Sequence, residues 1–120
     1  MATDDTCCTI APYFNVHDGK LDAFRALCER FVDTTRTEEK CLYYGFSFAG
    51  NEVHCREAYT DAKGLLAHVK HVGPLLEESL TLADLSRLEI HGPEQELEVL
   101  RRELADLNPQ FFVLQYGFRK

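Results

Sequence analysis

The chain has 120 residues, which is enough to bury one hydrophobic core but not two. Its formal net charge of −7 argues against a nucleic-acid-binding protein, because such proteins meet phosphates with clustered lysine and arginine. No apolar stretch approaches the ~20 residues that span a bilayer, and residues 1–6 lack the basic and apolar regions of a secretory signal. We therefore expect a single cytoplasmic domain over residues 1–120 that binds neither nucleic acid nor membrane.

The first predicted element is a strand over residues 7–16, in which apolar side chains alternate. Pro12 removes one backbone donor from this strand and indicates an edge position or a bulge. Residues 17–20 form a turn. From Leu21 the apolar residues recur at helical spacing, so an amphipathic helix is expected to run to about Arg36.

A hairpin and a capped helix follow. Residues 41–48 and 53–59 read as two strands joined by a Gly-Asn loop, which is typical of a hairpin. Thr60 and Asp61 are N-cap candidates for the next helix, which the sequence Gly73-Pro74 interrupts before a second short turn at 75–80.

The last predicted elements are a strand over 85–91, a helix and a final strand over 111–118. Pro93 suits the first turn of the helix, and the sequence Asn108-Pro109 ends it. The order is therefore β-α-β-β-α-β followed by an added helix and strand. The first six elements form the split βαβ pattern of an α+β ferredoxin-like sheet.

The predicted sheet has apolar residues on both faces. In residues 111–118, Phe112 and Phe118 lie on one face while Phe111 and Val113 lie on the other. A single layer of helices covers only one face, and an uncovered apolar face usually marks an interface. We therefore expect a homodimer, because a symmetric partner covers such a face most simply.

Three short stretches carry a recognisable pattern: His-Asp-Gly-Lys at 17–20, Glu-Ala-Tyr-Thr-Asp at 57–61, and Ala-His at 67–68. With these stretches, over about residues 8–92, the chain resembles the antibiotic biosynthesis monooxygenase family of the dimeric α+β barrel superfamily. Tyr59 stands where this family most often has tryptophan. Residues 93–118 exceed the family's minimal core, and in related dimers such additions often embrace the partner.

The resemblance implies a pocket between the helices and the sheet, with His68 near it. A neutral imidazole there could accept a proton from a phenolic substrate, because the pKa of histidine lies close to working pH. The alternative is a structural histidine that binds a backbone carbonyl while its helix docks. Glu57 could orient His68, or it could pair with Arg56 or Arg87.

Further pocket candidates are aromatic or basic. Tyr59, Tyr44 and Tyr43 could stack on a flat ring and donate hydrogen bonds, although aromatics at alternating positions are more often core residues. Arg56 could steady an anionic substrate. His71 shares a helix face with His68 and adds a second imidazole to the candidate pocket.

No metal or cofactor site is expected. A metal at His68 and His71 would need a third ligand, and the candidate, His54, lies on a different strand face from Glu57. The five cysteines are odd in number and lack the paired spacing of zinc ligands. Cys28 falls on the apolar face of the first helix, where it would pack as a small hydrophobe. Nucleotide-binding and hydrolase-elbow motifs are absent from the sequence.

The leading hypothesis is a cofactor-independent monooxygenase that oxidises a quinol-like or polycyclic aromatic substrate with O₂. In this hypothesis His68, Tyr59 and Glu57 are catalytic, and Tyr44, Tyr43, His71 and Arg56 line the substrate pocket. One alternative is a non-catalytic dimeric module that binds a small aromatic or apolar molecule. The other is a lyase, cyclase or isomerase that uses the same pocket without oxygen.

Overall fold

The computed structural model describes residues 3–120, and its elements follow the predicted order. They are β1 (Cys8–Val16), α1 (Leu21–Thr35), β2 (Cys41–Ala49), β3 (Glu52–Tyr59), α2 (Ala62–His71), α3 (Gly73–Ser79), β4 (Ala83–Gly92), α4 (Glu94–Glu103), the 3₁₀ turn η1 (Ala105–Leu107) and β5 (Gln110–Val113). The α+β ferredoxin-like pattern with an added helix and strand is confirmed. No helix in residues 3–120 is long and apolar enough to cross a membrane.

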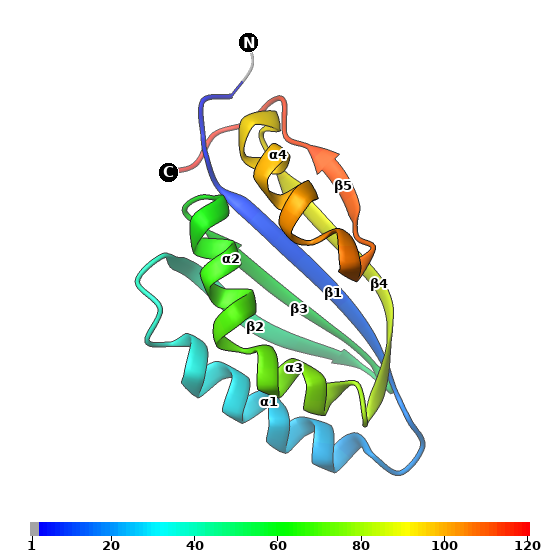
Figure 1. Cartoon of the computed structure of the whole chain (residues 1–120). Coiled ribbons are helices and arrows are strands. Elements are labelled where there is room, and N and C mark those ends of the chain that lie inside the picture. The colour runs from blue at the N-terminus through cyan, green and yellow to red at the C-terminus, as the bar shows by residue number, and fades with distance from the viewer. Residues whose placement is uncertain (1–2) are drawn as a thin grey trace.

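The sheet has the strand order β2-β3-β1-β4-β5, so β1 lies at its centre (Figure 1). The edge position suggested by Pro12 is therefore wrong, whereas the suggested irregularity is present next to it. The register between β1 and β4 shifts between Tyr13 and Phe14. The Pro12 carbonyl binds the Nδ1 atom of His54 at 3.1 Å. Proline lacks the amide donor of a regular ladder, and it is tolerated in this central strand because the β1–β3 register has no partners for residues 10–12.

The final strand is shorter than predicted. β5 ends at Val113, which pairs in parallel with Gly92, the last residue of β4. Beyond this point β4 offers no backbone groups for pairing, so residues 114–120 contain no strand. As a result Tyr116 and Phe118 are not on a sheet face but are 72% and 82% exposed.

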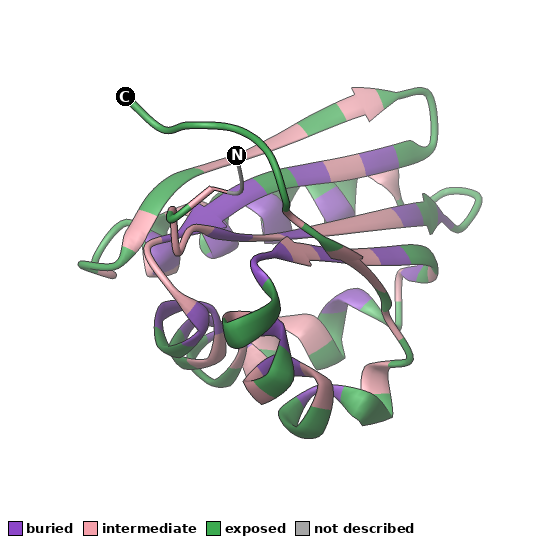
Figure 2. Ribbon diagram, turned by 90° about the horizontal axis from the view of Figure 1, so that it is seen from above, coloured by how far each residue is buried: buried purple, intermediate pink, exposed green. Residues whose placement is uncertain are grey.

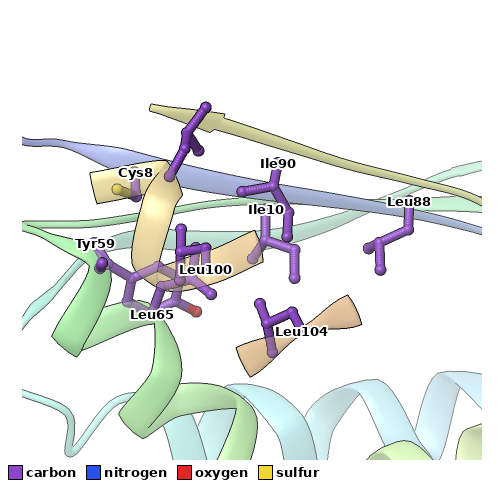
Figure 3. Close-up of a cluster of buried hydrophobic side chains, with 10 residues drawn as sticks. Cys8, Ile10, Tyr59, Leu65, Leu88, Ile90, Leu100 and Leu104 are labelled. Carbon is purple, nitrogen blue, oxygen red and sulfur yellow. The ribbon is translucent and has the colours of Figure 1, made fainter. Parts of the chain in front are cut away.

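The helices all lie on one face of the sheet, and the hydrophobic core lies between these two layers (Figures 1 and 2). Figure 3 shows Ile10, Leu88 and Ile90 pointing from the strands toward Leu65, Leu100 and Leu104. A fully buried leucine or isoleucine contributes about 1.5–3 kcal/mol relative to an exposed one. This packing holds α2 and α4 against the sheet and so fixes the position of the residues that α2 carries.

The helix α2 begins at a conventional cap. Asp61 has an extended backbone, and its side chain accepts a hydrogen bond from the Gly64 amide at 2.9 Å. The predicted N-cap is therefore confirmed at Asp61. The close approach of this first turn to the rest of the fold requires glycine at position 64, because a Cβ atom there would lie 2.8 Å from Cβ of Lys40.

Candidate functional site

A mostly apolar cavity lies between the sheet and the helices. Its walls come from β1, β2, β3 and β4 on the sheet side and from α1, α2, α3 and η1 on the other side. Most lining residues are aliphatic or aromatic, among them Ile10, Phe14, Phe31, Phe46, Leu85 and Leu88. Glu57, His68, Tyr44 and Cys55 are the lining residues with polar side-chain atoms. This is the place where the resemblance predicted a pocket.

Glu57 reaches this cavity because β3 alternates. Val53, Cys55, Glu57 and Tyr59 are the buried members of one face of the strand. The Glu57 side chain is 4% exposed, and its Oε1 atom lies 2.6 Å from the Tyr59 hydroxyl, which donates to it. The same oxygen lies 3.2 Å from Nε2 of His68. A buried carboxylate requires such partners, because burying an unpaired charge is very unfavourable.

His68 lies between two carboxylates. Its Nε2 atom faces Glu57, and its Nδ1 atom lies 2.9 Å and 3.0 Å from the two carboxylate oxygens of Glu38. The alternative in which His68 binds a backbone carbonyl is therefore wrong. The imidazole also packs against the rings of Tyr59 and Tyr44, at centroid distances of 5.0 Å and 5.3 Å.

This environment favours the charged imidazole. Burial by itself would lower the pKa of His68, but the hydrogen bonds and negative charges of Glu57 and Glu38 outweigh it and raise the pKa above its ordinary value. The sequence predicts a neutral imidazole, whereas these two carboxylates favour the charged form. When His68 carries a proton on each ring nitrogen, Glu57 and Glu38 can accept the two hydrogen bonds.

Glu38 is the site residue that the sequence analysis missed. It lies in the turn between α1 and β2, 30 residues from His68 in the sequence, so no local periodicity links the two. Its Oε2 atom also lies 2.8 Å from Nδ1 of His71. His71 therefore joins the same cluster, although its side chain is 44% exposed and it does not line the cavity.

Tyr44 lines the cavity as expected from the alternation of β2. Burial raises the pKa of its hydroxyl above the ordinary range, as it does for Tyr59 and for the Cys55 thiol. These three groups therefore stay protonated near neutral pH. Thr35 Oγ1, at the end of α1, is buried and has no hydrogen-bond partner among residues 3–120.

Two expected pocket residues lie elsewhere. Tyr43 and Arg56 are exposed on the opposite face of the sheet, where the guanidinium carbon of Arg56 lies 5.2 Å from the centre of the Tyr43 ring. Because successive strand residues point to opposite faces, Arg56 cannot share a face with its neighbour Glu57. Arg87 likewise binds Glu89 and not Glu57.

The part of the chain that the structure describes contains no group of three or more histidine, cysteine, aspartate or glutamate side chains placed to hold a metal ion. His54, the third ligand considered from the sequence, instead stacks on Tyr13 at 4.3 Å on the far face of the sheet. What the site does present is a buried proton-carrying pair, Glu57 and His68, that faces apolar walls. Such a pair can donate or accept a proton.

Comparison with known proteins gave structural matches only: no family model and no curated protein matches the sequence. The chain is similar to MupZ from Pseudomonas fluorescens, with 44% identity, a TM-score of 0.94, and coverage of 100% of this chain and 94% of MupZ. It is also similar in structure to an antibiotic biosynthesis monooxygenase, with 17% identity and a TM-score of 0.61 over 69% of this chain and 92% of that one. A Bacteroides thetaiotaomicron protein described as a possible oxidoreductase is 18% identical, with a TM-score of 0.66 over 72% of this chain and 96% of that one. The chain therefore belongs to the same family as MupZ and shares the fold of that antibiotic biosynthesis monooxygenase.

Proposed function

We propose that this protein is a cofactor-independent enzyme that transfers a proton to or from a small apolar substrate, with Glu57 and His68 as its catalytic acid–base pair. The observation that carries the proposal is the placement of a carboxylate and an imidazole, each 4% exposed, at the wall of an otherwise apolar cavity. Replacing a buried ion pair by apolar residues is often neutral or stabilising. A buried pair is therefore weak evidence for a role in stability, which favours a chemical role for these charges.

The proton transfers within the pair are balanced. Glu57 uses Oε1 for both Tyr59 and His68, which leaves Oε2 for a substrate. When the proton on Nε2 of His68 moves to Glu57, the result is a neutral carboxylic acid beside a neutral imidazole. That acid can donate its proton to a substrate oxygen, and the reverse transfer removes a proton from a substrate carbon or hydroxyl group. No electrons are exchanged in either direction.

This chemistry fits a lyase, cyclase or isomerase best. Such reactions need a proton to be taken at one point and given at another, and Glu57 can do both: the carboxylate takes a proton, and the acid formed by transfer from Nε2 of His68 gives one. The apolar walls would bind the hydrocarbon part of the substrate and exclude water, which strengthens the electrostatic effect of the pair.

A cofactor-independent monooxygenase is the second candidate. The fold shared with an antibiotic biosynthesis monooxygenase favours it, as do the aromatic rings of Tyr44 and Tyr59 beside His68. Here Glu57 would take a proton from a quinol-like or polycyclic substrate. The resulting anion would react with O₂, one oxygen atom entering the product and the other leaving as water.

We also propose that the protein acts as a cytoplasmic homodimer whose interface is the helix-free face of the sheet. This face carries paired rings and charges, including the stack of His91 on Phe112 at 4.6 Å and the contact between Arg56 and Tyr43. Tyr43 and Arg56, which were expected in the pocket but lie on this face, would then be interface residues. Native mass spectrometry tests this assignment: we expect a dimer, and a monomer at micromolar concentration would contradict it.

The catalytic proposal can be tested with two probes. 5-Nitrobenzisoxazole opens when a base removes one proton and does not involve O₂, whereas anthrone consumes O₂ when it is oxidised. We expect the protein to accelerate the first reaction equally with and without air, and Glu57→Gln to reduce the rate by roughly 10²-fold or more. Acceleration of anthrone oxidation, lost without air, would support the monooxygenase instead.

The matched control is Glu78→Gln. Glu78 is also a carboxylate with a basic partner, Arg30 at 2.7 Å, but it lies on the outside of α3, away from the cavity and from the helix-free sheet face. We expect this variant to keep the wild-type rate with both probes. A wild-type protein that binds the probes without accelerating either reaction would instead indicate the non-catalytic module.

A further inference from the structure

The acid–base pair is connected to the protein surface by two further residues. The exposed side-chain fraction falls from 44% at His71 to 12% at Glu38 and to 4% at His68 and Glu57. Successive members lie within hydrogen-bond distance. The separations are 2.8 Å from His71 Nδ1 to Glu38 Oε2, 3.0 Å from this oxygen to His68 Nδ1, and 3.2 Å from His68 Nε2 to Glu57 Oε1.

We infer that Glu38 and His71 form a proton path that links the Glu57–His68 pair with solvent, and that Glu38 in addition positions the His68 ring. This inference rests on the proposed function of that pair. In this path, each residue that gives a proton toward the cavity receives one from the neighbouring residue nearer the surface. His71 exchanges protons with water and with Glu38. In the tautomer of His68 that carries its proton on Nε2, Nδ1 accepts a proton from Glu38 and Nε2 passes its own proton to Glu57, and the ring then returns to this tautomer.

The cavity explains why such a path is needed. Once an apolar substrate fills the cavity, water in the cavity can no longer reach Glu57. A net proton transfer to or from the substrate nevertheless leaves the Glu57–His68 pair with one proton too few or too many. The His68 side chain is only 4% exposed, so it cannot exchange directly with solvent. The half-exposed ring of His71 is the first group along the cluster that water reaches freely.

A contribution to stability does not by itself explain why His71 contacts Glu38. One carboxylate suffices to pair with Nδ1 of His68, and an ion pair between Glu38 and a half-exposed imidazole contributes about 1 kcal/mol at most. The helix nevertheless brings His71 to Glu38, because residues three apart lie on the same side of α2. Glu38 is held in place by its own backbone, whose amide donates to the Thr35 carbonyl at 2.9 Å.

The other titratable groups around His68 do not compete for the proton. They come from β2 and β3, and are Tyr44, Tyr59, Cys41 and Cys55. Burial raises the pKa of each, to about 11 for Cys41 and higher for the rest, so all four stay protonated near neutral pH. The carboxylates of Glu38 and Glu57 and the two imidazoles are therefore the groups that can exchange a proton.

The test measures proton exchange and not turnover. In the full-length protein labelled with ¹⁵N-histidine, NMR reports the protonation of each ring and the rate at which the His68 ring protons exchange with water. We expect this rate to follow the titration of His71 in the same spectra. In His71→Phe, which keeps a ring but has no nitrogen, we expect exchange to slow by roughly tenfold or more and to lose that pH dependence.

Two further variants separate this role from a structural one. Glu38→Gln should lower the pKa of His68 and slow its exchange, because the amide keeps the shape of the carboxylate without its charge. His17→Phe is the matched control, since His17 is also an exposed histidine paired with a carboxylate, Asp84 at 3.1 Å, but lies away from the cavity. His17→Phe should change neither the pKa of His68 nor the exchange rate of its ring protons.

The inference is overturned if His71→Phe folds normally and the His68 ring protons exchange at the wild-type rate and with the wild-type pH dependence. Because His71 is half exposed, this variant should fold even if Glu38→Gln does not. The proposed function fails on a different result, namely wild-type turnover of 5-nitrobenzisoxazole by Glu57→Gln. The two failures are therefore distinguishable.

Discussion

Replacement of Glu57 by glutamine isolates the charge of the buried carboxylate from its shape. The carboxylate accepts hydrogen bonds from Tyr59 at 2.6 Å and from His68 at 3.2 Å, both on Oε1. A glutamine oxygen can accept the same two bonds. A hydrogen bond to a charged group contributes about 1.5–3 kcal/mol and a neutral one about 0.5–1.5 kcal/mol, so each bond loses roughly 1 kcal/mol. We therefore expect Glu57→Gln to lower the free energy of unfolding by about 2 kcal/mol at acidic pH.

The pH dependence of this loss follows from His68. Because Glu57 and Glu38 raise its pKa in the folded protein, the charged His68 contributes stability that is fully present below its unfolded pKa of about 6.5. That contribution is lost as pH rises through the folded pKa. The difference between wild type and Glu57→Gln should thus be largest below about pH 6.5 and should shrink as the pH rises through the raised pKa of His68.

Denaturant unfolding of both proteins across this pH range measures the difference directly, by linear extrapolation. Glu78→Gln is again the control, and we expect it to lose no more than about 1 kcal/mol, because its carboxylate lies at the surface. A loss in Glu57→Gln no larger than in this control, or one that does not change with pH, would refute a charged His68 held between two carboxylates.

Two further predictions concern the elements around the site. Gly64→Ala should lower the free energy of unfolding by about 1–3 kcal/mol despite the better helix propensity of alanine, because its Cβ would lie 2.8 Å from Cβ of Lys40. Gly73→Ala should be neutral or stabilising by up to about 1 kcal/mol, because its Cβ would meet no atom within 4 Å. Thermal or denaturant unfolding measures both changes. Cys8 and Cys55 are buried, and burial raises the pKa of Cys8 to about 12 and that of Cys55 still higher. Both should resist a thiol reagent at pH 8 until the protein unfolds, and rapid labelling of either in the native protein would contradict their placement.

The order and type of the elements were predictable because their signals are local. The alternation of β3 placed Glu57 and Tyr59 on one buried face, and the helical spacing of α2 placed His68 and His71 on one side. Asp61 was recognisable as the cap of α2 because capping depends on a few adjacent residues. These features require no knowledge of what lies across the fold.

The tertiary structure decided what local patterns cannot express. Glu38 meets His68 only because the turn after α1 packs beside α2, and the charge of the imidazole depends on that contact. The central position of β1, which contains Pro12, follows from the pairing of strands that are distant in the sequence. The end of β5 has the same origin, because its last residue, Val113, pairs with the last residue of β4, Gly92. Alternation by itself determined that Glu57 and Arg56 point to opposite sides of the sheet. Which side is covered by helices and holds the cavity is a property of the assembled layers, because it depends on how the helices pack across the whole sheet.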